Sequence, residues 1–305
     1  MTKVETHFES CGDQIAANIY FPEGLGSGKQ LPAIVVAGPM ATVKEQAAGV
    51  FARALANRGF IALAFDYRRF GESEGSPRQF EDPTSKTEDV QSAVSFLCAH
   101  NDVKSDQIGA AGICASSSYI APAVSTDRRI KAFGTVSAHF SLREFFVENP
   151  MVTDEVLQQL LSVSNAARQT YFETGVSEPD SMIWPDFTGQ EEDALDPDIY
   201  DYYFARRAEC WPNFSNHLVP FSLEQLIRSH ALDYADQIVA PYLGVVGSEA
   251  VTRSYTERFV DAKSRGPKSI KVIEGARHIQ AYDVPEYIDQ GTDVLAEFFG
   301  EYLTA

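Results

Sequence analysis

The sequence predicts an α/β fold, in which a mostly parallel, twisted β-sheet is covered by helices on both faces. Three observations lead to this prediction. Apolar segments of strand length alternate with segments of helical periodicity along much of the chain. The apolar segments are nearly continuous, as expected of strands that are buried on both faces. The segments that connect them are short, which favours a mostly parallel sheet covered on both sides.

The first elements follow in order. Residues 15–20 form an early strand, and the apolar run at 31–37 forms the next one. Residues 43–57 have helical periodicity, and Gly59 stands where a glycine commonly ends a helix. Residues 60–65 are then expected to form another buried strand. The same alternation continues through a helix at 87–100, a strand at 108–111, a helix ending near 123 and a strand at 132–137.

The alternation then stops. Residues 140–235 predict mostly helix and are rich in aromatic and acidic side chains. The pattern resumes with a strand at 242–246, a helix at 255–263, a strand at 269–273 and a final helix at 290–303. We therefore expect a core made of 1–139 and 236–305, with 140–235 inserted as a helical lid. An insertion at this point lies over the carboxyl ends of the strands, where open α/β sheets bind ligands.

Composition excludes several classes of protein. The chain has 305 residues and a formal net charge of −18, which argues against nucleic acid or an anionic membrane as partner. The first residues show no apolar signal core, and no apolar run is long enough to span a bilayer, so a cytoplasmic location is expected. The four cysteines are far apart and have no metal-binding spacing, which predicts free thiols.

The sequence contains no pattern for a metal site and no glycine-rich phosphate loop. No cofactor is therefore expected, and a small-molecule substrate is the expected partner. A homodimer is left open as the assembly.

The segment Gly112-Ile113-Cys114-Ala115-Ser116 follows an apolar strand and leads directly into a helix. Small residues around a nucleophile on a sharp strand-to-helix turn define a nucleophile elbow, usually with the pattern G-x-S-x-G. Here Cys114 takes the central position, and the start of the next helix is expected to stabilise its thiolate. The alternative is that Cys114 is a small buried apolar residue. A second register would make Ser116 the nucleophile.

A thiol nucleophile needs a base, and the base needs an orienting acid. His278 is the one histidine that follows the last predicted strand, within a loop expected to return over the elbow. His139 ends a strand at the same sheet edge and is expected to contact the substrate. Glu249 follows the strand at 242–246 and is the predicted acid, whereas Asp233 and Asp236 precede that strand and are weaker candidates.

Charge that develops on a substrate oxygen needs hydrogen-bond donors. The backbone amide after the nucleophile, that of Ala115, is one candidate. The loop after the strand at 31–37 supplies the other, and Met40 is chosen there because Pro39 has no N–H. These two amides form the predicted oxyanion hole.

Several motifs together resemble the α/β-hydrolase family, in its dienelactone-hydrolase-like branch, and are also similar to polyketide transferases and thiohydrolases. They are Gly38-Pro39-Met40, Ala64-Phe65-Asp66-Tyr67-Arg68, Gly71-Glu72-Ser73-Glu74-Gly75, the elbow at 112–116 and Gly275-Ala276-Arg277-His278. The resemblance implies the α/β-hydrolase fold and a cysteine–histidine–aspartate triad, with Cys114 and His278 in matching positions. This chain departs from that pattern with Glu249 as the acid, Ser116 in place of the elbow glycine, and a larger lid.

The sequence thus predicts acyl transfer through an acyl-cysteine intermediate, with an ester, lactone or thioester as substrate and a Cys114–His278–Glu249 triad. Aromatic residues of the lid, among them Trp184 and Trp211, are expected to line an apolar substrate pocket. Two other functions are left open. The same pocket could serve a non-hydrolytic lyase, isomerase or cyclase that uses His278 as base, or a binding protein without catalysis.

Overall fold

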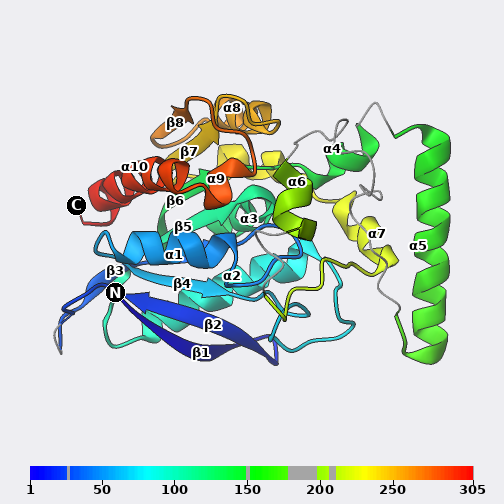
Figure 1. The fold of residues 1–305 in the computed structure, drawn as a ribbon, viewed down its shortest axis with the longest axis horizontal. Helices are drawn as coiled ribbons and strands as arrows, with labels where there is room; N and C mark the ends of the chain where they lie inside the picture. The colour runs from blue at the N-terminus through cyan, green and yellow to red at the C-terminus, as the bar shows by residue number, and fades with distance from the viewer. Residues whose placement is uncertain (26–27, 149–151, 178–197, 206–210, 305) are drawn as a thin grey trace.

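Eight strands form one sheet with helices on both faces (Figure 1). The computed structural model describes residues 1–25, 28–148, 152–177, 198–205 and 211–304. The strand order is β1-β2-β4-β3-β5-β6-β7-β8, and all neighbours from β4 to β8 are parallel, whereas β1 and β2 are antiparallel. The predicted α/β fold with a mostly parallel sheet is confirmed. The strands are β1 (Thr2–Ser10), β2 (Asp13–Phe21), β3 (Leu31–Ala37), β4 (Ile61–Phe65), β5 (Val103–Ile113), β6 (Ile130–Val136), β7 (Tyr242–Gly247) and β8 (Lys268–Ile273).

The helices divide between the two faces of the sheet. α1 and α10 pack on one face, and α2 and α3 pack on the other. In the described ranges the helices are α1 (Ala47–Ala56), α2 (Pro83–Ala99), α3 (Ser117–Thr126), α4 (Leu142–Val147), α5 (Asp154–Thr174), α6 (Asp198–Tyr200), α7 (Leu223–Leu226), α8 (Arg253–Ala262), α9 (Gln280–Asp283) and α10 (Pro285–Leu303), with short 3-10 or π turns η1 (Cys114–Ser116), η2 (Asp201–Ala205), η3 (Pro220–Ser222) and η4 (Ala231–Gln237). None of these helices has the length and apolar character needed to cross a bilayer.

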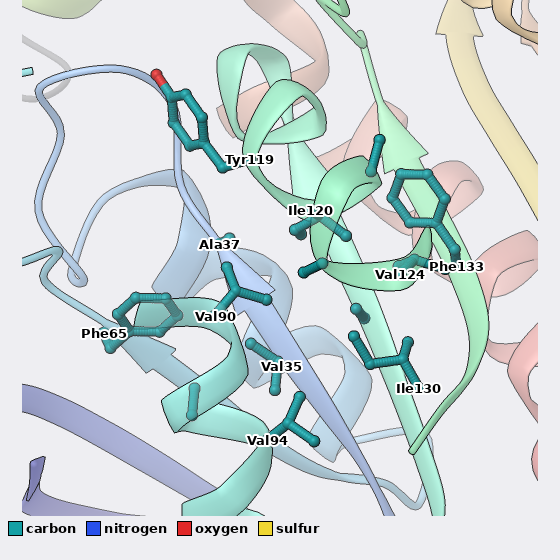
Figure 2. Close-up of a cluster of buried hydrophobic side chains, with 14 of the residues drawn as sticks. Val35, Ala37, Phe65, Val90, Val94, Tyr119, Ile120, Val124, Ile130 and Phe133 are labelled. Carbon is teal, nitrogen blue, oxygen red and sulfur yellow. The ribbon is translucent and has the colours of Figure 1, made fainter. Parts of the chain in front are cut away.

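Strand β3 shows why the central strands read as continuous apolar runs. Successive side chains of a strand point to opposite faces. Val35 therefore packs into the core beneath α2 and α3, while Ile34 and Val36 pack into the core beneath α1 and α10. Figure 2 shows the first of these cores, with Val35 beside Val90 and Val94 of α2. Burial of each such side chain contributes roughly 1.5–3 kcal/mol.

The insertion after β6 is mainly helical where the structure describes it. It contains α4 to α7, and its longest helix, α5, lies at the outer edge of the molecule beyond α7 (Figure 1). α5 packs on η3 and α7 through a narrow stripe, and Ser164 is its one buried residue. The mainly helical character expected for 140–235 is therefore found in the described parts of that segment, and its role as a lid stays a prediction.

Candidate active site

Cys114 lies on a sharp turn between β5 and α3. Its backbone is left-handed, with φ of 56°, a conformation that a non-glycine residue rarely adopts and that costs free energy. Gly112 lets α3 approach the strand, because a Cβ atom there would lie only 3.1 Å from the Ser117 nitrogen and from Ile120 Cδ1. The geometry expected of the nucleophile elbow is therefore present at Cys114.

Ser116 stabilises this turn through hydrogen bonds to backbone groups of β5 and β3. Its side chain is fully buried, and Oγ accepts a hydrogen bond from the Ile113 amide at 2.7 Å. The hydroxyl also lies 2.8 Å from the Ala37 carbonyl oxygen at the end of β3, to which it can donate. These bonds fix the Ser116 hydroxyl inside the protein, so the second register, with Ser116 as nucleophile, does not fit the structure.

A cavity of about 190 Å³ opens above the elbow. Its walls come from both parts of the chain, because α4 of the insertion supplies three apolar side chains. Among the described residues that line it, none is Asp, Glu, Lys or Arg. The lining residues are Met40, Ala41, Cys114, Ala115, His139, Leu142, Phe145, Phe146, Ile199, Tyr203, Asn216, Val251, Thr252, Tyr255 and His278. An uncharged, largely apolar cavity of this kind favours an uncharged ligand.

His278 is placed over the elbow by the loop after β8, as the sequence predicts. The imidazole is only 6% exposed and lines the cavity. Its Nδ1 lies 2.7 Å from Thr252 Oγ1, and the Thr252 hydroxyl in turn lies 3.3 Å from the Ser137 carbonyl oxygen. Ser137 also holds the backbone of this loop, since its hydroxyl donates to the His278 carbonyl at 3.2 Å.

The structure differs from the expectation at Glu249. The Glu249 side chain is exposed, and its backbone amide donates to the Ala276 carbonyl at 3.1 Å. The strand β7 ends at Gly247, so the turn that follows directs residue 249 to the surface, and Thr252 at the start of α8 reaches Nδ1 instead. The Cys114–His278–Glu249 triad is therefore not assembled, and a neutral hydroxyl takes the place of the predicted acid.

This difference leads to a first prediction. We expect Glu249→Gln to change kcat/KM by no more than about twofold, the rate equivalent of the ~0.5 kcal/mol typical of exposed substitutions. Steady-state kinetics with an activated ester measures this directly. Thr252→Val, which keeps the shape but removes the hydroxyl at Nδ1, serves as the comparison and is expected to lose more activity. A loss of 100-fold or more in kcat/KM for Glu249→Gln would show that the Glu249 carboxylate takes part in the reaction.

Tyr282 is a site residue that the sequence reasoning missed. Its hydroxyl lies 2.5 Å from Nε2 of His278, and its proximity to Cys114 lowers the pKa of that thiol. The side chain belongs to α9 and is fully buried. The signal in the sequence is the spacing of four residues between His278 and Tyr282, which places two side chains on the same side of a helical turn.

Burial shifts the pKa values of Cys114 and His278 toward the neutral form of each group. Burial raises the pKa of the Cys114 thiol to about 11, although the Tyr282 hydroxyl and the Ala115 amide oppose this effect. Burial also lowers the pKa of His278 to about 4. The direction of this shift is opposite to the thiolate stabilisation expected from the start of the following helix, because burial outweighs the nearby donors.

His139 lies in the cavity wall, as predicted for a substrate contact. Its ring stacks on Tyr255 with 4.3 Å between centroids, and its amide donates to the Cys114 carbonyl at 3.1 Å. Burial, and then the proximity of His278, lower the pKa of His139 to about 3. Its buried Nδ1 has no hydrogen-bond partner among the described residues, so this atom is available to a ligand.

The predicted oxyanion residues both line the cavity beside Cys114. The Ala115 amide is directed at the Cys114 sulfur, and Met40 belongs to a strained loop in which Ala41 has a φ of 60°. The structure does not place either predicted tryptophan among the described residues that line the cavity. Trp211 is half-buried and is not among the residues that line the cavity, and Trp184 lies outside the described residues.

Comparison with known proteins extends this description. Residues 12–186 match the family model described as X-Pro dipeptidyl-peptidase (S15 family). The chain is 35% identical to the uncharacterized protein YcjY of Escherichia coli over 296 residues, which covers 95% of this chain and 94% of that protein. It is also 24% identical to polyketide transferase claH of Penicillium crustosum, over 96% of this chain and 94% of that protein.

A solved structure agrees with the fold. The chain superposes on the crystal structure of the α/β hydrolase GrgF from Penicillium sp. sh18 with a TM-score of 0.82, at 16% identity, and each chain is covered completely. At this level of identity the similarity concerns the fold alone.

Proposed function

Since this chain belongs to the α/β-hydrolase superfamily, in the family described as X-Pro dipeptidyl-peptidase (S15 family), we propose that it transfers acyl groups through an acyl-Cys114 intermediate. The fold and family make it a hydrolase- or acyltransferase-type enzyme. The finer proposal is that its substrate is an ester, lactone or thioester. The observation that supports it best is the strained Cys114 at the floor of an uncharged cavity, beside the Tyr282 hydroxyl and His278.

The proposed reaction has two half-reactions. The Cys114 sulfur attacks the acyl carbon and its proton goes toward His278, while the carbonyl oxygen gains charge beside the Ala115 and Met40 amides. The C–O or C–S bond of the substrate then breaks, and the leaving group takes the proton from the imidazolium. Water or an alcohol attacks the thioester next, gives a proton to His278, and releases the acyl group while the thiol is restored.

The cavity favours esters and thioesters over peptides. A dipeptidyl-peptidase has to hold the free ammonium group of its substrate, and a buried ammonium needs a carboxylate partner. No carboxylate lines the cavity among the residues that the structure describes. A thiol is also well suited to good leaving groups and poorly suited to amides. The substrate class proposed here is therefore an uncharged acyl ester or thioester, and a lactone meets the same requirements.

The proposal predicts a covalent intermediate. We expect intact-mass measurement after mixing with p-nitrophenyl esters or acyl thioesters of increasing chain length to show one added acyl group per chain. Peptide mapping should place it on Cys114. Cys98→Ala is the matched control, because Cys98 is another free cysteine and lies outside the cavity. It should acylate as the wild type does. Turnover of these substrates with an acyl group on a serine, or with no adduct under rapid quenching, would contradict the proposal.

A further inference from the structure

The Tyr282 hydroxyl is a neighbour of both Cys114 and His278. Its oxygen lies 2.5 Å from Nε2 of His278, and it is close enough to the Cys114 sulfur to lower the pKa of the thiol. The ring is held on two sides, by the His278 ring at 5.3 Å and by the Tyr202 ring at 5.5 Å between centroids. An oxygen bonded to Nε2 of His278 and close to the Cys114 sulfur is placed to carry a proton between them.

The hydrogen bonds around His278 determine which of its ring nitrogens carries the proton. When the Thr252 hydroxyl donates to the Ser137 carbonyl, its oxygen accepts a hydrogen bond from Nδ1. Nδ1 then carries the imidazole proton, and Nε2 presents a lone pair toward Tyr282. The Tyr282 O–H donates to that lone pair, so its oxygen is left to accept from the thiol. Thr252 thus fixes the tautomer that a base facing Tyr282 requires.

We propose that Tyr282 is a catalytic residue that relays the proton from Cys114 to His278 in the acyl-transfer reaction proposed above, on which this inference rests. As the sulfur attacks the acyl carbon, the S–H bond breaks and its proton bonds to the tyrosine oxygen. The original tyrosine proton moves to Nε2 in the same step. Tyr282 ends as a neutral phenol, and the products are the tetrahedral oxyanion and an imidazolium, so charge and protons balance.

Burial explains why the relay passes a proton without storing charge on the tyrosine. Burial, followed by the proximity of Cys114, raises the pKa of Tyr282 well above its ordinary value. A phenolate is therefore not populated, and the hydroxyl has to gain one proton as it gives up the other. The imidazolium that forms is stabilised by the Thr252 oxygen at Nδ1 instead of a carboxylate.

The reactivity of the thiol itself tests the relay without any substrate. We expect Tyr282→Phe to slow the alkylation of Cys114 by iodoacetamide at neutral pH about 100-fold, in the range of general acid–base contributions. The rate is followed by mass spectrometry on the peptide that contains Cys114. Tyr242→Phe is the matched control, because it also removes a buried tyrosine hydroxyl, which in β7 lies 2.8 Å from the Thr135 hydroxyl of β6. It should alkylate at the wild-type rate.

An unchanged or faster alkylation in folded Tyr282→Phe would overturn the relay, because it would show that Cys114 and His278 pair without the tyrosine. If the variant fails to fold, acylation of the wild type in mixtures of H2O and D2O provides the test. A relay moves two protons and gives a curved dependence on deuterium fraction, whereas a linear dependence overturns it.

The two proposals fail in different ways. If the wild type is alkylated in a Tyr282-dependent manner but no ester or thioester acylates it, the relay stands and the acyl-transfer function is wrong. If Tyr282→Phe acylates as fast as the wild type, the function stands and the relay is wrong.

Discussion

Replacement of Cys114 by alanine is expected to lower kcat/KM for esters and thioesters by about 10⁴-fold, since it removes the nucleophile and leaves only binding and oxyanion stabilisation. The cavity gains little space, so substrate binding and the fold should be kept. Initial rates with p-nitrophenyl esters measure the loss, and thermal unfolding checks the fold. Cys98→Ala controls for the loss of a thiol elsewhere and should match the wild type.

Two outcomes would contradict this. If Cys114→Ala turns over a substrate that His278→Ala does not, the site works as an acid–base lyase or isomerase without a covalent step. If ligand binding persists while neither wild type nor variants turn over any tested substrate, the protein is a binding protein. Cys114→Ser separates sulfur chemistry from position, because an elbow that needs only a hydroxyl or thiol at residue 114 would keep substantial activity.

The second large effect is on stability in acid. Two buried imidazoles, His278 and His139, have pKa values lowered by burial from 6.5 to about 4 and about 3. Between those values and 6.5 the unfolded chain binds protons that the folded chain excludes, so the free energy of unfolding falls as the pH falls. At pH 5 each histidine should cost about 2 kcal/mol relative to neutral pH, or about 4 kcal/mol together.

Urea unfolding at pH 7 and at pH 5 measures this loss. His278→Gln should lose about 2 kcal/mol less than the wild type between the two conditions. His7→Gln is the control for removal of a histidine, because His7 is exposed on β1 and lies outside the cavity lining. The comparison also cancels the buried Asp66 and Asp89, whose pKa values are raised by burial and which titrate in the opposite sense. Equal pH dependence of His278→Gln and the wild type would contradict the prediction.

The sequence predicts the strands that are buried on both faces, because such strands are apolar at nearly every position. β3 and β4 are apolar at nearly every position, and the structure buries them on both sides. β1 was not predicted, because it is an edge strand in which six of the nine residues are exposed and one is half-buried. It pairs with β2 through the left-handed turn at Cys11 and Gly12, whose φ values are 50° and 92°.

The site was predictable where topology determines it. Cys114 and His278 end up together because the elbow and the loop after β8 meet at the carboxyl edge of the sheet. The partner of His278 was not predictable in the same way, since the expectation looked for a carboxylate directly after β7. Thr252, three residues further along, makes that contact with an uncharged side chain, in a pocket whose described lining residues carry no charge. The four-residue spacing from His278 could have indicated Tyr282, but no known sequence motif marks a buried tyrosine next to a cysteine.

The neutral state of Cys114 also determines which chemistry the protein avoids. Hydrogen peroxide oxidises thiolates far faster than thiols, and with a pKa of about 11 this sulfur is almost never ionised at rest. Reaction at this sulfur requires that the thiol first loses its proton, so oxidants that react only with thiolates are expected to react slowly. A raised pKa at Cys114 therefore also disfavours its oxidation to a sulfenic acid.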